Sequence, residues 1–245
     1  MPTLNLNNIN ALYYENSLCN KLYKGSQQLY PQIGDPYLNN VILYLKGDDL
    51  NDNSPINRMV TNNNNVIVNT LIKKYGSGSL DFNRSNSLSF TGDDLNFTNQ
   101  DFTVESWVYN RSFTPYNFLY GSWEGTVTLS SFLAAVNNTS LSHAFSESGF
   151  YTPAYEYYYN IPFNLNQWYH LAFTRQGNAF KSWVNGNLVD QRNFNISLYS
   201  SNHFSIGANN NNQSADALID SFRITKGVAR YIGNFDPEFD TYLMY

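Results

Sequence analysis

Aspartates gather at two points of this 245-residue sequence where strands are predicted to end or begin. Asp48, Asp49 and Asp52 follow the apolar run 41–45, and Asp220 lies in a later apolar segment. Carboxylate oxygens are the hard ligands that calcium takes in proteins. Asp is also an ordinary turn residue, because its side chain bonds to nearby backbone N–H groups. From the residues alone, these aspartates are either metal ligands or turn residues.

A second group of chemically useful side chains is aromatic. Five tyrosines fall within nine residues, and a tryptophan stands in a short segment between two glycines. Tyrosine combines an apolar ring with a polar tip, which suits binding surfaces. The cluster therefore predicts either a glycan-binding surface or a contact between subunits. The candidate residues are Tyr151, Tyr155, Tyr157, Tyr158, Tyr159 and Trp123.

Catalytic groups do not show the spacing of a familiar reaction. Retaining glycoside hydrolysis needs two carboxyl groups about 5–5.5 Å apart. Glu105 is the sole acidic residue of its predicted strand, while Glu147 and Glu156 lie in an irregular polar region. His143 and His203 have polar neighbours in sequence and no metal-ligand spacing between them. We therefore predict a protein that is not an enzyme.

Composition excludes several classes of protein. Only 13% of residues are charged and the formal net charge is −5, so no basic patch for nucleic acid is present. A single cysteine, Cys19, cannot form an internal disulfide. The sequence shows neither a signal peptide nor a membrane-spanning run of apolar residues. We expect synthesis in a host cytoplasm and no membrane insertion.

The elements that would position these residues are strands. Residues 102–109 alternate, with Phe102, Val104, Ser106 and Val108 expected on one face. Further strands are predicted at 41–45, 79–82, 87–90, 181–184 and 188–191, and Asn185-Gly186 is a strong hairpin signal. Residues 137–166 are polar, aromatic and contain proline, so we expect a long loop or irregular edge there. These short strands predict an all-β, two-sheet antiparallel sandwich.

The N-terminal segment carries a short repeat. Residues 12–18 are echoed at 22–29, and each copy reads as a strand, a polar turn and a return strand. Gly34-Asp-Pro36 then marks a boundary. We predict a β-hairpin arm over residues 1–34 and a sandwich over residues 35–245.

Several motifs occur together in one order that resembles a laminin-G-like jelly roll of the concanavalin A-like superfamily. The resemblance implies a jelly-roll fold and, at the rim of the sandwich, a calcium site, for which Asp48, Asp49, Asp52 and Asp220 are the candidates. The motifs are Val41-Ile-Leu-Tyr-Leu-Lys-Gly-Asp48, Asp101-Phe-Thr-Val-Glu-Ser-Trp-Val108, Trp168-Tyr-His-Leu-Ala-Phe-Thr-Arg175, Phe204-Ser-Ile-Gly207 and Ile219-Asp-Ser-Phe-Arg-Ile-Thr-Lys-Gly-Val-Ala-Arg-Tyr231.

Within that superfamily, the residues of two motifs resemble those of laminin-G-like domains from tailed bacteriophages. They are the lead-in Asp35-Pro-Tyr37 and the ending Arg223-Ile-Thr-Lys-Gly-Val-Ala-Arg-Tyr231. This resemblance implies a virion surface protein of the capsid-decoration or tail-fibre type. Its arm would dock to other virion proteins, and its sandwich, expected as a homo-oligomer, would contact host-surface glycans.

Two alternatives stay open at this point. One is a purely structural decoration or cementing protein without a glycan ligand. The other is a carbohydrate-binding or adhesion module of a cellular protein. In each case we expect a non-enzymatic β-sandwich.

Overall fold

The computed structural model describes residues 13–14, 17–18, 22–24, 27–30, 35–113, 117–124, 128–149, 156–208 and 214–238. Over these ranges the chain is all-β apart from short helical turns such as Leu38–Asn40 and Asp93–Leu95. No helix in the described ranges is both long and apolar enough to span a membrane. The predicted fold class is confirmed.

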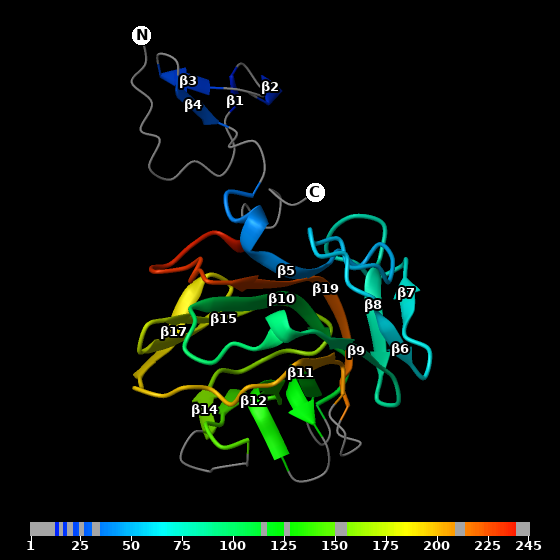
Figure 1. The fold of residues 1–245 in the computed structure, drawn as a ribbon. Helices are drawn as coiled ribbons and strands as arrows, with labels where there is room; N and C mark the ends of the chain where they lie inside the picture. The colour runs from blue at the N-terminus through cyan, green and yellow to red at the C-terminus, as the bar shows by residue number, and fades with distance from the viewer. Residues whose placement is uncertain are drawn as a thin grey trace.

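Two antiparallel sheets lie face to face and form a sandwich (Figure 1). The eight-stranded sheet has the order β17-β16-β15-β10-β19-β8-β7, with β5 also paired to β19. Its strands are β5 (Val41–Leu45), β7 (Ile67–Asn69), β8 (Ser79–Asn83), β10 (Phe102–Asn110), β15 (Trp168–Gln176), β16 (Ala179–Val184), β17 (Asn187–Asn193) and β19 (Asp216–Lys226).

The opposite layer is a seven-stranded sheet with the order β14-β13-β12-β11-β18-β9-β6. Strands from distant parts of the sequence become neighbours here, because β18 pairs with both β9 and β11. Its strands are β6 (Thr61–Asn63), β9 (Ser87–Thr91), β11 (Asn117–Glu124), β12 (Thr128–Val136), β13 (Ser140–Phe145), β14 (Glu156–Asn160) and β18 (His203–Ile206).

Aromatic rings from both sheets fill the space between them. β10 contributes Phe102, Val104 and Val108 to this core, as its alternation predicts. The ring of Phe132 stacks on that of Phe173 with centroids 5.1 Å apart, which joins β12 of one sheet to β15 of the other. Burying such rings supplies most of the hydrophobic stabilisation of a sandwich.

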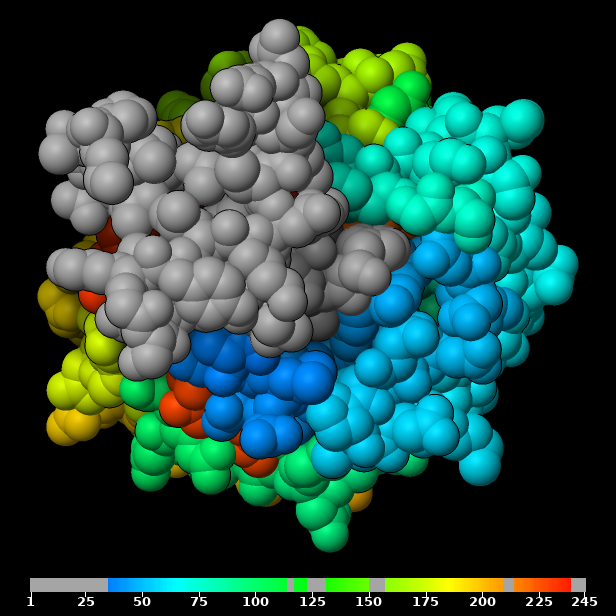
Figure 2. Space-filling model, turned by 90° about the horizontal axis from the view of Figure 1, so that it is seen from above, coloured from blue at the N-terminus to red at the C-terminus, as the bar shows by residue number. Residues whose placement is uncertain are grey.

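The segment before β5 and the segment after β19 lie side by side on the outer face of the eight-stranded sheet. Arg230 donates to both carboxylate oxygens of Asp35. Figure 2 shows the same proximity, with orange-red atoms bordering the blue atoms of the first described residues of the sandwich. An ion pair therefore joins the segment before β5 to the segment after β19.

Two short hairpins are present in the N-terminal segment, as the repeat predicts. β1 (Tyr13–Tyr14) pairs with β2 (Ser17–Leu18), and β3 (Leu22–Lys24) pairs with β4 (Gln27–Tyr30). The division into an arm over 1–34 and a sandwich over 35–245 stays a prediction.

The expectation of a loop or irregular edge over 137–166 is wrong for residues 140–145 and 156–160. β13 and β14 are regular strands there, and β14 forms the edge of its sheet. Leu141, His143 and Phe145 all point into the core, so His143 takes an apolar position in an otherwise clear alternation. Because histidine is a polar residue type, the apolar alternation of β13 is not evident from the sequence.

Candidate functional site

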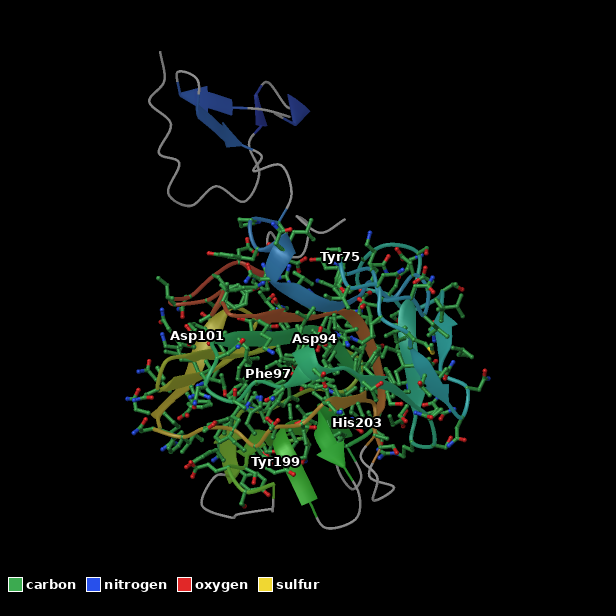
Figure 3. All side chains as sticks on the ribbon, in the orientation of Figure 1. Tyr75, Asp94, Phe97, Asp101, Tyr199 and His203 are labelled. Atoms are coloured by element: carbon green, nitrogen blue, oxygen red, sulfur yellow. The ribbon has the colours of Figure 1, made fainter. Side chains whose placement is uncertain are left out.

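A polar groove of about 630 Å³ lies on the outer face of the seven-stranded sheet. It covers the part of the sheet formed by β6, β9 and β18, and we call it the serine groove. His203, at the start of β18, marks its position in the lower layer of Figure 3. The groove is lined by Asn63, Asn64, Arg84, Ser85, Ser87, Ser89, His203, Ser205, Ala208 and Ser214.

Strand alternation places small hydroxyl side chains on the base of the groove. In β9, Leu88 and Phe90 are buried in the core, so Ser87 and Ser89 face outward. Ser89 lies directly opposite Ser205 of β18, whose other neighbour is Gly121 of β11. Because these side chains are short, the outer surface of the sheet is recessed here.

Gly121 is required at its position by close packing. A Cβ atom added there would lie 2.6 Å from the carbonyl oxygen of Phe132 and 2.9 Å from Cα of Leu133. No real Cβ atom is accommodated at such distances without movement of the backbone. The tight contact between β11 and β12 thus leaves the position beside Ser205 without a side chain.

Amide and guanidinium groups form the sides of the groove. The Nδ2 of Asn63 donates to Oγ of Ser89 at 3.1 Å, which fixes the orientation of that amide. Arg84 donates from Nη1 to the carbonyl oxygen of Ser214 and from Nη2 to Oγ of Ser112, at 3.3 and 3.1 Å. These contacts hold the polar groups of the groove in fixed positions before any ligand binds.

The chemistry available in the groove is hydrogen bonding. Amides and hydroxyls both donate and accept, and arginine donates only. None of the described lining residues is Asp or Glu, so these residues supply no general acid and base pair for glycoside hydrolysis. The arrangement suits a ligand rich in hydroxyl groups.

This groove was not predicted from the sequence, although part of its lining follows a recognisable sequence pattern. Ser87 and Ser89 alternate with Leu88 and Phe90 in a predicted strand. Small polar residues on the solvent face of a strand are common, so this pattern alone does not mark a site. The pairing of β9 with β18, which brings in Ser205 and His203, is a feature of the fold.

The predicted tyrosine cluster is divided between the two faces of the seven-stranded sheet. On β14, Tyr159 is buried in the core and Tyr157 packs against it, while Tyr158 is 56% exposed on the other side. Tyr151 and Tyr155 lie outside the described residues. Among the described tyrosines of the cluster, Tyr158 is the most exposed, and Tyr157 is half-buried.

Trp123 lies near the end of β11. Its backbone pairs with Leu129 of β12. Its side chain lies outside the described part of the structure, so its role as a ligand contact stays a prediction.

The aspartates proposed for calcium bind backbone N–H groups instead of one another. Asp52 is buried and accepts from the backbone N–H groups of Tyr44, Ser54 and Arg58. Such contacts are the turn chemistry that the sequence left as the alternative. Asp52 therefore fastens the segment that follows β5 back onto that strand.

The other three aspartates show the same kind of contact. Asp220 accepts from the backbone N–H groups of Lys74 and Tyr75 at 2.8 and 3.1 Å, and Asp48 accepts from the backbone N–H and the hydroxyl of Ser77. Asp49 accepts from the backbone of Asn51 at 2.9 Å. No group of three acidic, cysteine or histidine side chains that could hold a metal ion occurs among the described residues. Calcium binding stays a prediction that these contacts do not support.

A cluster of buried charged side chains lies on the outer face of the eight-stranded sheet. Glu105 is 3% exposed and contacts Arg223 at 2.7 Å and Nε2 of His170 at 3.2 Å. Burial raises the pKa of Glu105, but the charge of Arg223, the hydrogen bond and charge of His170, and the charge of Arg230 bring that pKa well below its usual range. A carboxylate held ionised in this way cannot act as a general acid.

Comparisons with known proteins agree with this fold. The Laminin_G_3 model, described as the concanavalin A-like lectin/glucanases superfamily, matches residues 82–229, which is more than half of the chain. No curated protein matches the sequence.

Solved structures of binding domains are similar in fold. The binding domain of Paraclostridial Mosquitocidal Protein 1 has a TM-score of 0.62 at 15% identity, over 84% of this chain and 52% of that chain. The binding domain of Botulinum Neurotoxin DC has a TM-score of 0.60 at 15% identity, over 85% of this chain and 52% of that chain. This chain thus spans about half the length of those binding domains.

A third similar structure matches along nearly its whole length. It is domain 4 of AbnA, a GH43 extracellular arabinanase from Geobacillus stearothermophilus, with a TM-score of 0.59 at 19% identity. The match covers 84% of this chain and 98% of that one. At this level of identity the three structures support the sandwich fold alone.

Proposed function

This chain belongs to the concanavalin A-like lectin/glucanases superfamily, and we propose that it is a non-catalytic glycan-binding module whose ligand lies in the serine groove. The carrying observation is the lining of that groove. Hydroxyl and amide groups of Ser87, Ser89 and Asn63 face a hollow that contains no carboxylate among its described residues. A sugar presents hydroxyl groups that both donate and accept, and this array can satisfy them.

The similar structures support the same class of ligand. Domain 4 of the arabinanase was solved in complex with arabinotriose, and the Botulinum Neurotoxin DC binding domain was solved in complex with SialylT. A related structure concerns cell entry of botulinum neurotoxin type C, which depends on two ganglioside molecules. We carry the binding of glycans, and no particular glycan, to this chain.

A glycan array with the full chain tests the proposal. The chain is displayed in many copies, because multivalency raises avidity about 10²–10⁴-fold. We expect retention of at least one glycan and its loss in Ser89→Trp, whose indole would occupy the groove. Thr70→Trp is the control, because Thr70 is exposed and lies beyond β7 of the other sheet. Loss of binding in both variants, or in neither, would contradict the placement of the ligand.

We further propose that the module is displayed on a bacteriophage virion, with residues 1–34 as its docking arm. The support is a resemblance in sequence: the motifs Asp35-Pro-Tyr37 and 223–231 are similar to motifs of tailed-bacteriophage proteins. Particles assembled with a chain that lacks residues 1–34 test this role. We expect the shortened chain to be missing from purified particles, and unchanged incorporation would rule the arm out.

A further inference from the structure

A second hollow lies beside the serine groove, at the end of the sandwich where the loop before β18 meets the turn after β9. It has a volume of about 320 Å³ and is lined by Asp93, Asn96, Tyr199, Ser200 and Asn202. We call it the Tyr199 pocket. It adjoins the serine groove, because Asn202 lines one hollow and the next residue, His203, lines the other. Figure 3 shows Tyr199 and His203 in the same lower layer of the molecule.

The ring of Tyr199 is held in place and remains 41% exposed. A Cβ atom at Gly149 would lie 3.0 Å from three atoms of this ring, so the glycine backbone packs directly against it. The backbone N–H of Tyr199 donates to the carbonyl oxygen of Ser146 at 2.7 Å. A tyrosine backed in this way presents a fixed apolar surface on which the C–H face of a sugar ring can pack.

The two loops of the pocket are fastened to each other. The backbone N–H of Gly92 donates to the carbonyl oxygen of Asn202 at 2.9 Å, and that of Leu198 donates to Thr98 at 3.1 Å. Such contacts fix the pocket before a ligand arrives, which lowers the entropy lost on binding.

The polar groups around Tyr199 complete a set that fits sugar hydroxyls. Asn96 donates from Nδ2 to Oγ of Ser200 at 2.7 Å, which leaves the hydroxyl hydrogen of Ser200 for another acceptor. Asp93 is exposed, and the structure gives its carboxylate no hydrogen bond or ion pair within the described residues. The Asp93 carboxylate, the Ser200 hydroxyl and the Asn202 amide around one exposed ring provide acceptors and donors on several sides of a ligand.

Charge distinguishes the two hollows. The serine groove includes Arg84 and His203, whereas Asp93 is the sole charged residue among the described residues that line the Tyr199 pocket. A carboxylate repels acidic sugars and accepts hydrogen bonds from neutral ones. The volume lies at the lower end of the range for small-molecule sites, about 300–1,000 Å³, which matches one or two sugar rings.

We propose that the Tyr199 pocket is a separate subsite for a neutral sugar, which packs on Tyr199 and hydrogen-bonds to Asp93, Ser200 and Asn202. This inference rests on the proposed glycan-binding function and adds the class of sugar. A longer glycan that occupies both hollows would place a neutral residue here and extend across His203 into the serine groove.

Binding to two sets of conjugates tests the subsite. The neutral set carries galactose, glucose, mannose, arabinose or N-acetylglucosamine, and the acidic set carries sialic acid or glucuronic acid. We expect the wild-type chain to retain a neutral conjugate. In Tyr199→Ala this binding should weaken about tenfold through loss of the ring contact, and Asp93→Asn should weaken it less. Tyr199→Phe keeps the ring and should retain binding, which separates the loss of a contact from a failure to fold.

Each alternative outcome has a distinct meaning. Unchanged neutral-sugar binding in Tyr199→Ala, together with its loss in Ser89→Trp, would overturn the subsite while leaving the serine groove as the binding site. Retention of acidic conjugates alone would also overturn it. Loss of neutral-sugar binding in Tyr199→Ala but not in Ser89→Trp would support the subsite and contradict the groove. A wild-type chain that retains no conjugate of either set would contradict the proposed function itself.

Discussion

His143 shows how a single side chain can belong to the core despite its polar type. Its Nδ1 lies 3.0 Å from Oγ of Ser182, a residue of the opposite sheet, and its ring stacks on Phe173 with centroids 4.5 Å apart. Burial lowers the pKa of His143 to about 3. The ring is therefore neutral in the folded protein over the whole physiological range.

The stability of the protein should depend on pH through this histidine. In the unfolded chain a histidine has a pKa of about 6.5. Between the two pKa values, the unfolded state therefore binds a proton at His143 and the folded state does not. The stabilisation is complete above about pH 6.5 and is lost as pH falls from there toward about 3. Each pH unit in that window costs about 1.4 kcal/mol. Urea unfolding at pH 7 and pH 5 should show a loss of about 2 kcal/mol that His143→Leu lacks. Equal losses in both proteins would contradict the assignment.

Glu105, unlike His143, contributes to stability in its charged form. Because its pKa is lowered in the folded state, its stabilisation is present above the unfolded value, about 4.3, and lost as pH falls below it. Glu105→Gln removes the nearer of the two carboxylates that contact the buried Arg223 and leaves Asp35 at 3.4 Å, so we expect a cost of about 3 kcal/mol, the lower end for a broken buried pair. The difference between wild type and variant should be largest at pH 7 and should shrink below about pH 4. A difference that does not change with pH would show that geometry, and not charge, is responsible.

At the scale of elements, the strands with the clearest periodicity were the most predictable. β5 has the predicted bounds, and the alternation of β10 places Phe102, Val104 and Val108 in the core as expected. In the Asn185-Gly186 turn both residues have positive φ, 48° and 75°, as a tight hairpin of this type requires. Local sequence decides these features, and so it predicts them.

Features that depend on contacts between distant segments were not predictable. β14 reads as a tyrosine-rich loop because nothing in its own residues shows that Tyr157 and Tyr159 face Phe145, Phe194 and the core. Likewise Ser89 and Ser205 become neighbours only through the pairing of β9 with β18. The candidate site was missed because it is assembled across strands.

The hairpin between β16 and β17 supports a prediction of its own. A Cβ at Gly186 would lie 2.0 Å from the carbonyl oxygen of Phe235, because the turn packs against the segment after β19. Gly177 has a similar positive φ of 57° but nothing within 4 Å of such a Cβ. Gly177→Ala should cost about 1 kcal/mol from backbone strain alone. Gly186→Ala should cost more, about 2–4 kcal/mol, because the contact with Phe235 must also move. Equal losses of stability in the two variants, measured by thermal unfolding, would show that the backbone at Phe235 moves away without a cost in free energy.

At the scale of the whole molecule, the outer faces of the two sheets differ in what they carry. The eight-stranded sheet holds the Glu105 cluster beneath Tyr231 and Arg230, whose side chains also bond Glu105 and Asp35. The seven-stranded sheet holds the serine groove and, beside it, the Tyr199 pocket. In our proposal, the face with the Glu105 cluster contributes to stability and the face with the two hollows binds the ligand.

Mapping the bound ligand by backbone amide chemical shifts tests this assignment most directly. The full chain is titrated with a glycan that it retains on the array, and shifts are followed in both sheets. We predict shifts in the segments Ser87–Ser89 and Asn202–Ser205, and none in β16 and β17. Shifts confined to the eight-stranded sheet, or around Asp48 and Asp220, would contradict it.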